Sequence, residues 1–267
     1  MPVDIFGNIK SNNTMILYHY TSINHFRGIW KEKKLYFSPA IKTNDFFERF
    51  KTFVMNQDTF KYKGQQLDRN KFDNFDDKIW EELRIYNQVS FSYDYKDGLK
   101  GYASPMMWGQ YAWTKDQDRN GQNGVCIAID SDKIKEPSFK FYSKFVSYKP
   151  KIVHPIVENI DYTLEEAAAL FVERNIDTYF FTKHTHWEHE NEYRYVSKHK
   201  GSLDISNAIV GIYILFEDNT SSEEIESLVK DNSLIHMLDV DDINNHREPM
   251  TLKDIYYLQE MMRTYKF

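Results

Sequence analysis

Two short segments, far apart in the sequence, contain the side chains best suited to chemistry. The first is LYHYTS at 17–22, in which His19 stands near the end of a short apolar run. Side chains alternate between the two faces of a strand, so Tyr18 and Tyr20 share one face and His19 lies on the other. A histidine at a strand end can offer a hydrogen bond to a ligand hydroxyl, and the alternative is a bond to a backbone carbonyl.

The second segment is WEHENEYRY at 187–195. As a strand it would place four charged side chains on one face, namely Glu188, Glu190, Glu192 and Arg194. Carboxylates on one face repel each other unless a positive charge lies opposite, and Arg194 most simply pairs with Glu192. A remaining carboxylate could bind a ribose hydroxyl or stabilise a cationic transition state. The alternative is a charged strand edge that faces solvent.

Two further pairs of residues fit either a site or an ordinary structural role. Asn44 and Asp45 follow a predicted strand, where they suit a helix cap or the rim of a site. Trp108 and Tyr111 fall on one face of a predicted helix. Most such aromatic pairs belong to a core, and the alternative is a platform that stacks on a flat ring.

Several other chemistries are disfavoured by the sequence. His184, His186 and His189 lie close together, but their spacing matches no metal-binding motif and no cysteine accompanies them, so we expect no metal. The motifs GxGxxG, GxxxxGK[ST] and GxSxG are absent. Cys126 lies in an apolar run and is expected to be a buried, inert thiol. An acyl-transfer hydrolase is therefore disfavoured.

These candidate residues depend on an ordered series of strands and helices. Apolar and aromatic patterns predict strands at 15–20, 35–38, 89–93, 125–130, 139–148, 186–197, 208–216 and 235–240. Helical spacing and caps predict helices at 23–33, after Asp45, and at 77–87, 106–113, 163–182, 221–230 and 251–265. Because the two kinds of element are interspersed without strict alternation, we expect an α+β fold with a mixed sheet and flanking helices.

The composition and length of the chain limit its possible domain organisation. The chain has 267 residues, of which 41% are hydrophobic and 16% aromatic, and contains neither an internal repeat nor a low-complexity linker. We expect a single domain over 1–267, with a polar segment at 1–14. A core would cover 15–215, and a helix-strand-helix extension 216–267. The formal charge of -6 argues against a general nucleic-acid binder, although lysines recur at 133–151.

The single cysteine and the beginning of the chain bear on location. One cysteine cannot form an intramolecular disulfide, which favours a reducing compartment. The first residues, MPVDIFGNIKSNN, lack the apolar core of a signal peptide. No apolar run approaches the length of a membrane span. We therefore expect a cytoplasmic protein that does not engage a membrane.

Taken in order, seven segments resemble a bacterial family of domains of unknown function, the one numbered 2971. They are LYHYTS, LYFSPAIKTNDFFE, VSFSY, SPMMWGQYA, GVCIAID, FVSYKP and WEHENEYR, and they span roughly residues 15–215. Each segment is short, but their common order is specific. One departure is Phe46, which stands where the family has a proline after Asn-Asp, and this change affects a helix start more than any chemistry.

That family is similar in outline to ADP-ribosyltransferases of the His-Tyr-Glu type. The resemblance implies a mostly antiparallel, split sheet that binds NAD without a dinucleotide-binding glycine loop. It implies that His19 contacts the nicotinamide-side ribose, that Tyr36 stacks on nicotinamide, and that Glu190 or Glu192 stabilises the oxocarbenium-like centre. The other residues expected to bind NAD are Tyr20, Thr21, Ser38, Asn44, Trp108, Tyr111 and Arg194. Pairing of Arg194 with Glu192 favours Glu190 as the catalytic carboxylate.

The implied function is that of an NAD-dependent ADP-ribosyltransferase, for example a toxin or an anti-phage defence effector. Its acceptor would be a protein, a nucleic acid or a small molecule. One alternative is an NAD glycohydrolase, in which water is the acceptor. Another is a non-catalytic nucleotide-binding or regulatory module that keeps the fold.

Overall fold

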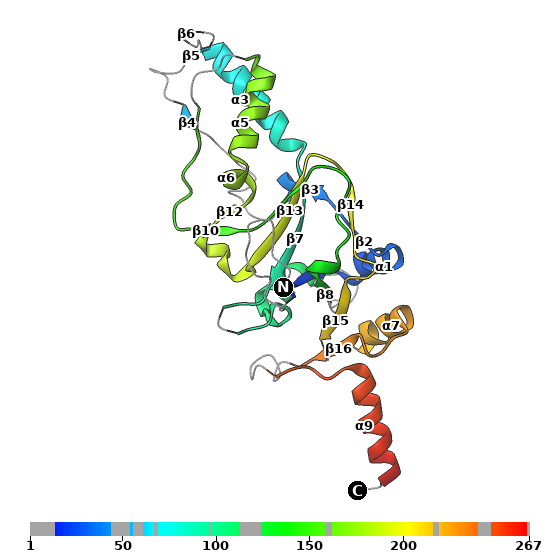
Figure 1. Ribbon diagram of the computed structural model, residues 1–267. Coiled ribbons are helices and arrows are strands. Elements are labelled where there is room, and N and C mark those ends of the chain that lie inside the picture. The colour runs from blue at the N-terminus through cyan, green and yellow to red at the C-terminus, as the bar shows by residue number, and fades with distance from the viewer. Residues whose placement is uncertain are drawn as a thin grey trace, which may run out of the picture.

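The computed structural model describes residues 14–43, 54–55, 61–62, 64–66, 69–96, 98–112, 124–157, 162–215, 219–239 and 247–265. Within these ranges, eight strands form the main sheet (Figure 1). They are β1 (Ile16–Thr21), β3 (Ser38–Pro39), β7 (Asn87–Tyr93), β8 (Val125–Asp130), β9 (Tyr142–Phe145), β13 (Glu192–Ser197), β15 (Ile209–Leu215) and β16 (Ile235–Leu238). Their order is β16-β15-β8-β1-β7-β13-β9, and β3 pairs with β7.

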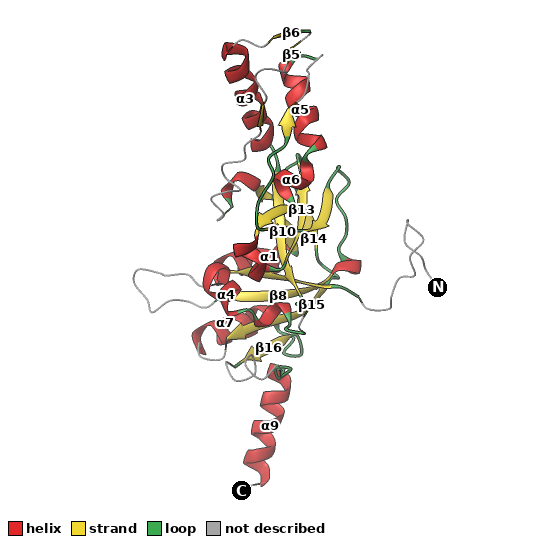
Figure 2. Ribbon diagram, turned by 90° about the vertical axis from the view of Figure 1, so that its left-hand side faces the viewer, coloured by secondary structure: helices red, strands yellow, loops and turns green. Residues whose placement is uncertain are grey.

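The helices lie around this sheet and beyond its ends. They are α1 (Ile23–Glu32), α3 (Arg69–Arg84), α4 (Pro105–Met107), α5 (Leu164–Arg174), α6 (Ile176–Phe180), α7 (Asn219–Val229) and α9 (Leu252–Tyr265). Figures 1 and 2 show α3 and α5 side by side at one end of the molecule and α9 leading away at the other. Every helix in the described ranges is too short or too polar to cross a bilayer.

Short elements connect these parts. The two-stranded sheets pair β2 (Lys34–Tyr36) with β14 (Ser202–Asp204), β4 (Val54–Met55) with β11 (Ile156–Val157), β5 (Lys61–Tyr62) with β6 (Gln65–Gln66), and β10 (Ser147–Lys149) with β12 (Thr182–His184). Single turns of helix are η1 (Ala40–Lys42), η2 (Gly101–Ala103), η3 (Trp108–Ala112), η4 (Ser131–Lys133) and η5 (Thr185–Glu190). Of these, η3 has π-helical hydrogen bonding.

The sheet is antiparallel at every strand pair except β15–β16, so the predicted α+β class with a mostly antiparallel mixed sheet is confirmed. Strand β8 shows why a continuous apolar run in the sequence correctly predicted a strand. All six of its residues are buried, with Val125, Ile127 and Ile129 in one core cluster and Cys126 and Ala128 in another. A strand covered on both faces has a continuous apolar sequence rather than an alternating one.

The sheet opens between β1 and β7. These strands pair at Leu17–Tyr93 and Tyr18–Ser92 and are not paired further along. The same edge of β7 then pairs with β3, at Gln88 and Asn87. Between the two pairings, residues 89–91 of β7 have no strand beside them on this edge, while β13 pairs with the opposite edge along its whole length. The opening is where the pocket described below lies.

The segment 186–197 differs from the single strand that alternation predicted. It begins as η5, turns at Asn191, whose φ is 43°, and becomes β13 only at Glu192. The amide of Asn191 donates to the carbonyls of Tyr93 and Asp94, at 2.9 and 3.0 Å, and so fixes the turn against the end of β7. Asparagine tolerates a left-handed conformation better than most residues.

Other predicted elements are divided, and one cannot be compared. The strand expected at 35–38 forms β2 and β3, which belong to different sheets. The helix expected at 163–182 breaks at Asn175 into α5 and α6, and the side-chain amide of Asn175 donates to the carbonyl of Phe171. The strand or hairpin expected at 139–148 forms β9 and β10, which belong to different sheets. The helix expected after Asp45 lies outside the described residues, as does Asn44.

Candidate functional site

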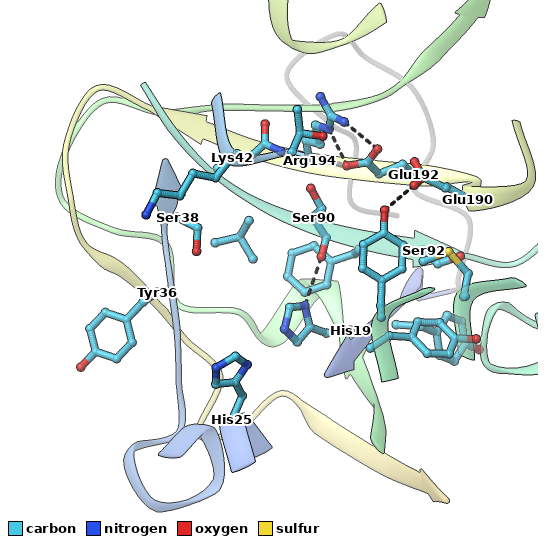
Figure 3. Close-up of a pocket in the computed structure, with 18 of the residues that line it drawn as sticks. His19, His25, Tyr36, Ser38, Lys42, Ser90, Ser92, Glu190, Glu192 and Arg194 are labelled. Atoms are coloured by element: carbon cyan, nitrogen blue, oxygen red, sulfur yellow. Dashed lines mark hydrogen bonds and ion pairs between the residues drawn. The ribbon is translucent and has the colours of Figure 1, made fainter. Parts of the chain in front are cut away.

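A pocket of about 460 Å³ lies at the opening between β1 and β7 (Figure 3). Strands β1 and β7 and the elements around them line it, with Tyr18, His19, Tyr20, His25, Tyr36, Ser38, Pro39, Lys42, Thr43, Gln88, Val89, Ser90, Phe91, Ser92, Met107, Tyr111, Lys183, Glu190, Glu192 and Arg194. The size suits a small-molecule ligand. His19 and both candidate glutamates, which are far apart in the chain, line this one pocket.

His19 is fixed by the opening itself. Its Nδ1 lies 3.1 Å from the carbonyl oxygen of Ser90, on the stretch of β7 that has no strand beside it. A carbonyl can only accept, so Nδ1 must be the protonated nitrogen. Burial lowers the pKa of His19, although the bond to Ser90 acts in the opposite direction. The ring is therefore neutral near pH 7, and its Nε2 is left as an acceptor.

Glu192 is held by two cations. Arg194 forms a two-pronged ion pair with it, through Nε to Oε1 and through Nη2 to Oε2 at 2.8 Å. The Nζ of Lys183 lies 3.0 Å from the same Oε2. Burial alone would raise the pKa of Glu192, but the charges of Arg194 and Lys183 outweigh it and hold the pKa well below its usual range. The expected pairing of Arg194 with Glu192 is confirmed.

Glu190 has a different environment. Its Oε2 forms an ion pair with Lys183, and its Oε1 accepts a hydrogen bond of 2.5 Å from the hydroxyl of Tyr111. Burial and the nearby charge of Glu192 raise its pKa, and Lys183 and Tyr111 only partly offset them. The charge on Glu190 is thus less fully compensated than the charge on Glu192.

The four charged groups are almost wholly enclosed. Lys183 is 2% exposed, Glu190 2%, Glu192 5% and Arg194 1%. A third guanidinium bond joins Nη1 of Arg194 to the carbonyl of Phe180, at 2.8 Å. Replacing such a buried ion network with apolar residues is often neutral or stabilising, so stability alone is weak grounds for its presence. Strongly perturbed carboxylates beside a pocket are typical of a functional site.

The remaining predicted ligand-binding residues divide into two groups. Tyr20, Tyr36, Ser38 and Tyr111 line the pocket. Tyr36 lies at the outer side of the pocket (Figure 3). It is 60% exposed, and its hydroxyl donates to the carboxylate of Glu32.

Thr21 and Trp108 are buried and do not line the pocket. The indole of Trp108 packs edge-on against Tyr20 and donates to the carbonyl of Tyr102, so Trp108 belongs to the core rather than to a stacking platform.

The pocket also includes residues that the sequence patterns did not single out. The most notable are Lys183, Ser90, Gln88, Lys42 and His25. Gln88 and Ser90 lie two residues apart in β7, so their side chains are on the same face of the strand. This could have been predicted from the sequence once β7 was predicted. Lys183 gave no such signal, because β12 is only three residues long and the contacts of Lys183 with Glu190, Glu192 and Trp187 form only in the fold.

The histidines at 184, 186 and 189 bond mainly to one another and to the backbone. His184 Nε2 lies 2.9 Å from the carbonyl of Pro150, and His189 Nδ1 lies 3.1 Å from the carbonyl of His186. Among the residues that the structure describes, no group of three or more His, Cys, Asp or Glu side chains is placed to hold a metal ion. Cys126 is buried, and burial raises the pKa of its thiol well above the ordinary value.

Comparison with known proteins gives one match. Residues 107–195 match a family described as "Protein of unknown function (DUF2971)". This range contains Tyr111, Lys183, Glu190, Glu192 and Arg194, which form the charged side of the pocket. No curated protein matches the chain, and no solved structure does. Over residues 107–195 the chain is therefore similar to the DUF2971 family.

Proposed function

We propose that the protein binds NAD in this pocket and transfers the ADP-ribose part to an acceptor. The observation that carries the proposal is that His19 and the carboxylates of Glu190 and Glu192 line one pocket, at the opening between β1 and β7. The resemblance of the sequence to His-Tyr-Glu type ADP-ribosyltransferases is in keeping with such a site. The pocket volume also lies within the range of small-molecule sites.

His19 would recognise a ribose hydroxyl. Because its Nδ1 is committed to the carbonyl of Ser90, the neutral ring presents Nε2 as an acceptor. A hydroxyl group of NAD is a donor that fits this acceptor. A protonated histidine would instead present a donor and a positive charge beside the charge that develops on the ribose.

Glu190 would stabilise the transition state. In the reaction, the bond between the ribose C1′ and the nicotinamide nitrogen breaks, and nicotinamide leaves with the bonding electrons. The ribose carries positive charge until the acceptor supplies an electron pair, forms the new bond and gives up its proton. A carboxylate fixed close to the ribose stabilises that positive charge. Glu190 is better suited than Glu192, whose charge Arg194 and Lys183 already balance.

The test is release of nicotinamide from NAD labelled in that ring, measured with cell extract supplied as acceptor. We expect Glu190→Gln to lower the rate by about 100-fold or more. His19→Ala should weaken NAD binding, and Glu188→Gln should behave as wild type. Glu188 is an exposed residue of the same turn that does not line the pocket. A wild-type protein that releases no nicotinamide would overturn the proposal.

Product analysis separates transfer from hydrolysis, since water as acceptor would give free ADP-ribose. A second candidate function is a non-catalytic nucleotide-binding module. The observation that favours it is that Glu190 and Glu192 are both enclosed and paired. It predicts that NAD raises the melting temperature without being consumed.

A further inference from the structure

Lys183 lies at the centre of the buried charges. It is the middle residue of β12, and its side chain points inward while those of Thr182 and His184 are only half-buried. Its ammonium contacts Oε2 of Glu190 and Oε2 of Glu192, the latter at 3.0 Å. The ring of Trp187 lies on the same ammonium, with its centroid 5.3 Å away. A compact ammonium can serve two carboxylates at once, which a planar guanidinium does less easily.

The balance of charges among these four side chains indicates the role of the Lys183 ammonium. The site holds two carboxylates and two cations, and Arg194 is committed to Glu192 through two hydrogen bonds. Without Lys183, an enclosed site would carry two carboxylates and one cation. Two close carboxylates cannot both stay ionised without compensation, so one of them would take up a proton. That group would be Glu190, which has the less complete set of partners.

We propose that Lys183 is a positioning residue: its ammonium keeps Glu190 ionised beside Glu192 and holds the Glu190 carboxylate at the wall of the pocket. The catalytic consequence rests on the proposed function, whereas the electrostatic consequence does not. Lys183 acts through Glu190 and need not touch NAD.

The groups that face Glu190 come from four elements. Tyr111 of η3 donates to its Oε1, and Lys183 of β12 contacts its Oε2. Glu192 and Arg194 follow on β13, and Tyr148 of β10 lies close enough for the charge of Glu190 to raise its pKa, after burial and Glu192. Of these groups, Lys183 is the cation in contact with Glu190, so its removal should change the pKa of Glu190 most.

A direct titration tests the electrostatic role. Protein labelled with ¹³C in its glutamate carboxyl groups would be titrated by NMR, and Glu190 would be assigned from the signal lost in Glu190→Gln. In Lys183→Met we expect the titration midpoint of Glu190 to rise by at least about 1 pH unit. Lys183→Arg keeps the positive charge but serves two carboxylates less easily, so its midpoint should lie between those of wild type and Lys183→Met. Lys149→Met is the matched control, since Lys149 is an exposed lysine of the adjacent strand β10. An unchanged midpoint in Lys183→Met would overturn the proposal.

The pH dependence of nicotinamide release tests the catalytic consequence. Ionised Glu190 is the active form, so a raised pKa moves the acid limb of the rate profile to higher pH by the same amount in Lys183→Met. A rate that falls with an unmoved limb would mean that Lys183 has only a packing role. If wild-type protein does not cleave NAD at all, the proposed function fails, and the NMR titration still decides the role of Lys183.

Lys183→Met could also fail to fold, because it leaves an uncompensated buried charge. The double variant Lys183→Met with Glu190→Gln removes that charge. We expect it to recover the folded state and a melting temperature closer to that of wild type. A double variant that stays unfolded would show that the lysine is required for packing, and would overturn the proposal.

Discussion

Two glutamates separated by one residue have opposite electrostatic environments. Glu192 has its charge matched by the guanidinium of Arg194 and the ammonium of Lys183. Glu190 shares that ammonium and otherwise has the hydroxyl of Tyr111. When the surroundings of two carboxylic acids lower the pKa of one and raise that of the other, the first is suited to a structural role and the second to chemistry. We therefore expect Glu192 to hold the site together and Glu190 to be the carboxylate that responds to a ligand.

The lowered pKa of Glu192 predicts a loss of stability in acid. A group whose pKa is lowered by folding contributes stability above its unfolded pKa, about 4.3 for glutamate, and this contribution is lost as the pH falls toward the folded pKa. We expect the free energy of unfolding in urea to fall by a few kcal/mol as the pH drops below about 5. Glu192→Gln should be less stable by about 3 kcal/mol at pH 7, because Arg194 loses its partner.

In Glu192→Gln, the acid-induced decrease should also be smaller than in wild type. Glu188→Gln, at an exposed position, serves as control and should follow the wild-type curve. If the free energy of unfolding falls equally with pH in wild type and in Glu192→Gln, protonation of Glu192 is not the cause of the loss of stability in acid.

At the scale of elements, the turn at Asn191 determines how the two glutamates meet. It ends η5 at Glu190 and starts β13 at Glu192, so the two carboxylates approach the same lysine from different elements. A continuous strand would place both side chains on one face, about two residue spacings apart. In the structure, the turn instead brings Glu190 to Lys183 from η5 and Glu192 from β13.

Substitutions at Asn191 should separate its backbone role from its hydrogen bonds. Asn191→Gly keeps the left-handed conformation accessible and loses the two side-chain bonds, which we expect to lower stability by about 1–2 kcal/mol. Asn191→Ala adds strain at positive φ, of about 1 kcal/mol more. Chemical unfolding measures both changes. If the alanine variant is no less stable than the glycine variant, the positive φ is not a source of strain.

The sequence correctly predicted those elements whose pattern of residue types lies within their own segment. Strands β8 and β15 were found from continuous apolar runs, and the pairing of Arg194 with Glu192 from their spacing of two on a strand. The turn at Asn191 was missed because WEHENEYR alternates as a strand would, while the bonds that form the turn reach residues 93 and 94. Lys183 was missed because β12 has three residues and shows no pattern of its own, while the contacts of Lys183 with Glu190, Glu192 and Trp187 form only in the fold.

At the scale of the whole molecule, the helices at the two ends of the sheet belong to separate core clusters. Figures 1 and 2 show α3, α5 and α6 gathered beyond one end of the sheet, while α7 and α9 lie near β16 at the other. The helices α3, α5 and α6 share one core cluster, and the strands β1, β8 and β15 share another with α1 and α7. The pocket lies where β1 and β7 diverge.

Among the residues whose burial the structure describes, those of helix α9 that pack into the core lie at its start. Leu252 is buried in the core and Ile255 packs against it, whereas Tyr256–Met261 are exposed. We expect a chain that stops after Tyr256 to keep its melting temperature within about 2 °C of wild type and to bind NAD equally well. Leu252→Ala should instead destabilise the protein by about 2–4 kcal/mol. Thermal unfolding compares the two, and a truncation as damaging as Leu252→Ala would contradict the anchoring described here.

The opening between β1 and β7 also has a consequence for exchange of backbone hydrogens with solvent. The carbonyl of Ser90 is bonded to a side chain, that of His19, whereas Val89 and Phe91 pair with Tyr195 and Tyr193 of β13. Since the N–H and C=O of one strand residue point the same way, the amide of Ser90 faces the opening. Deuterium exchange followed by NMR should therefore be faster at Ser90 than at its two neighbours, and should slow when a ligand fills the pocket.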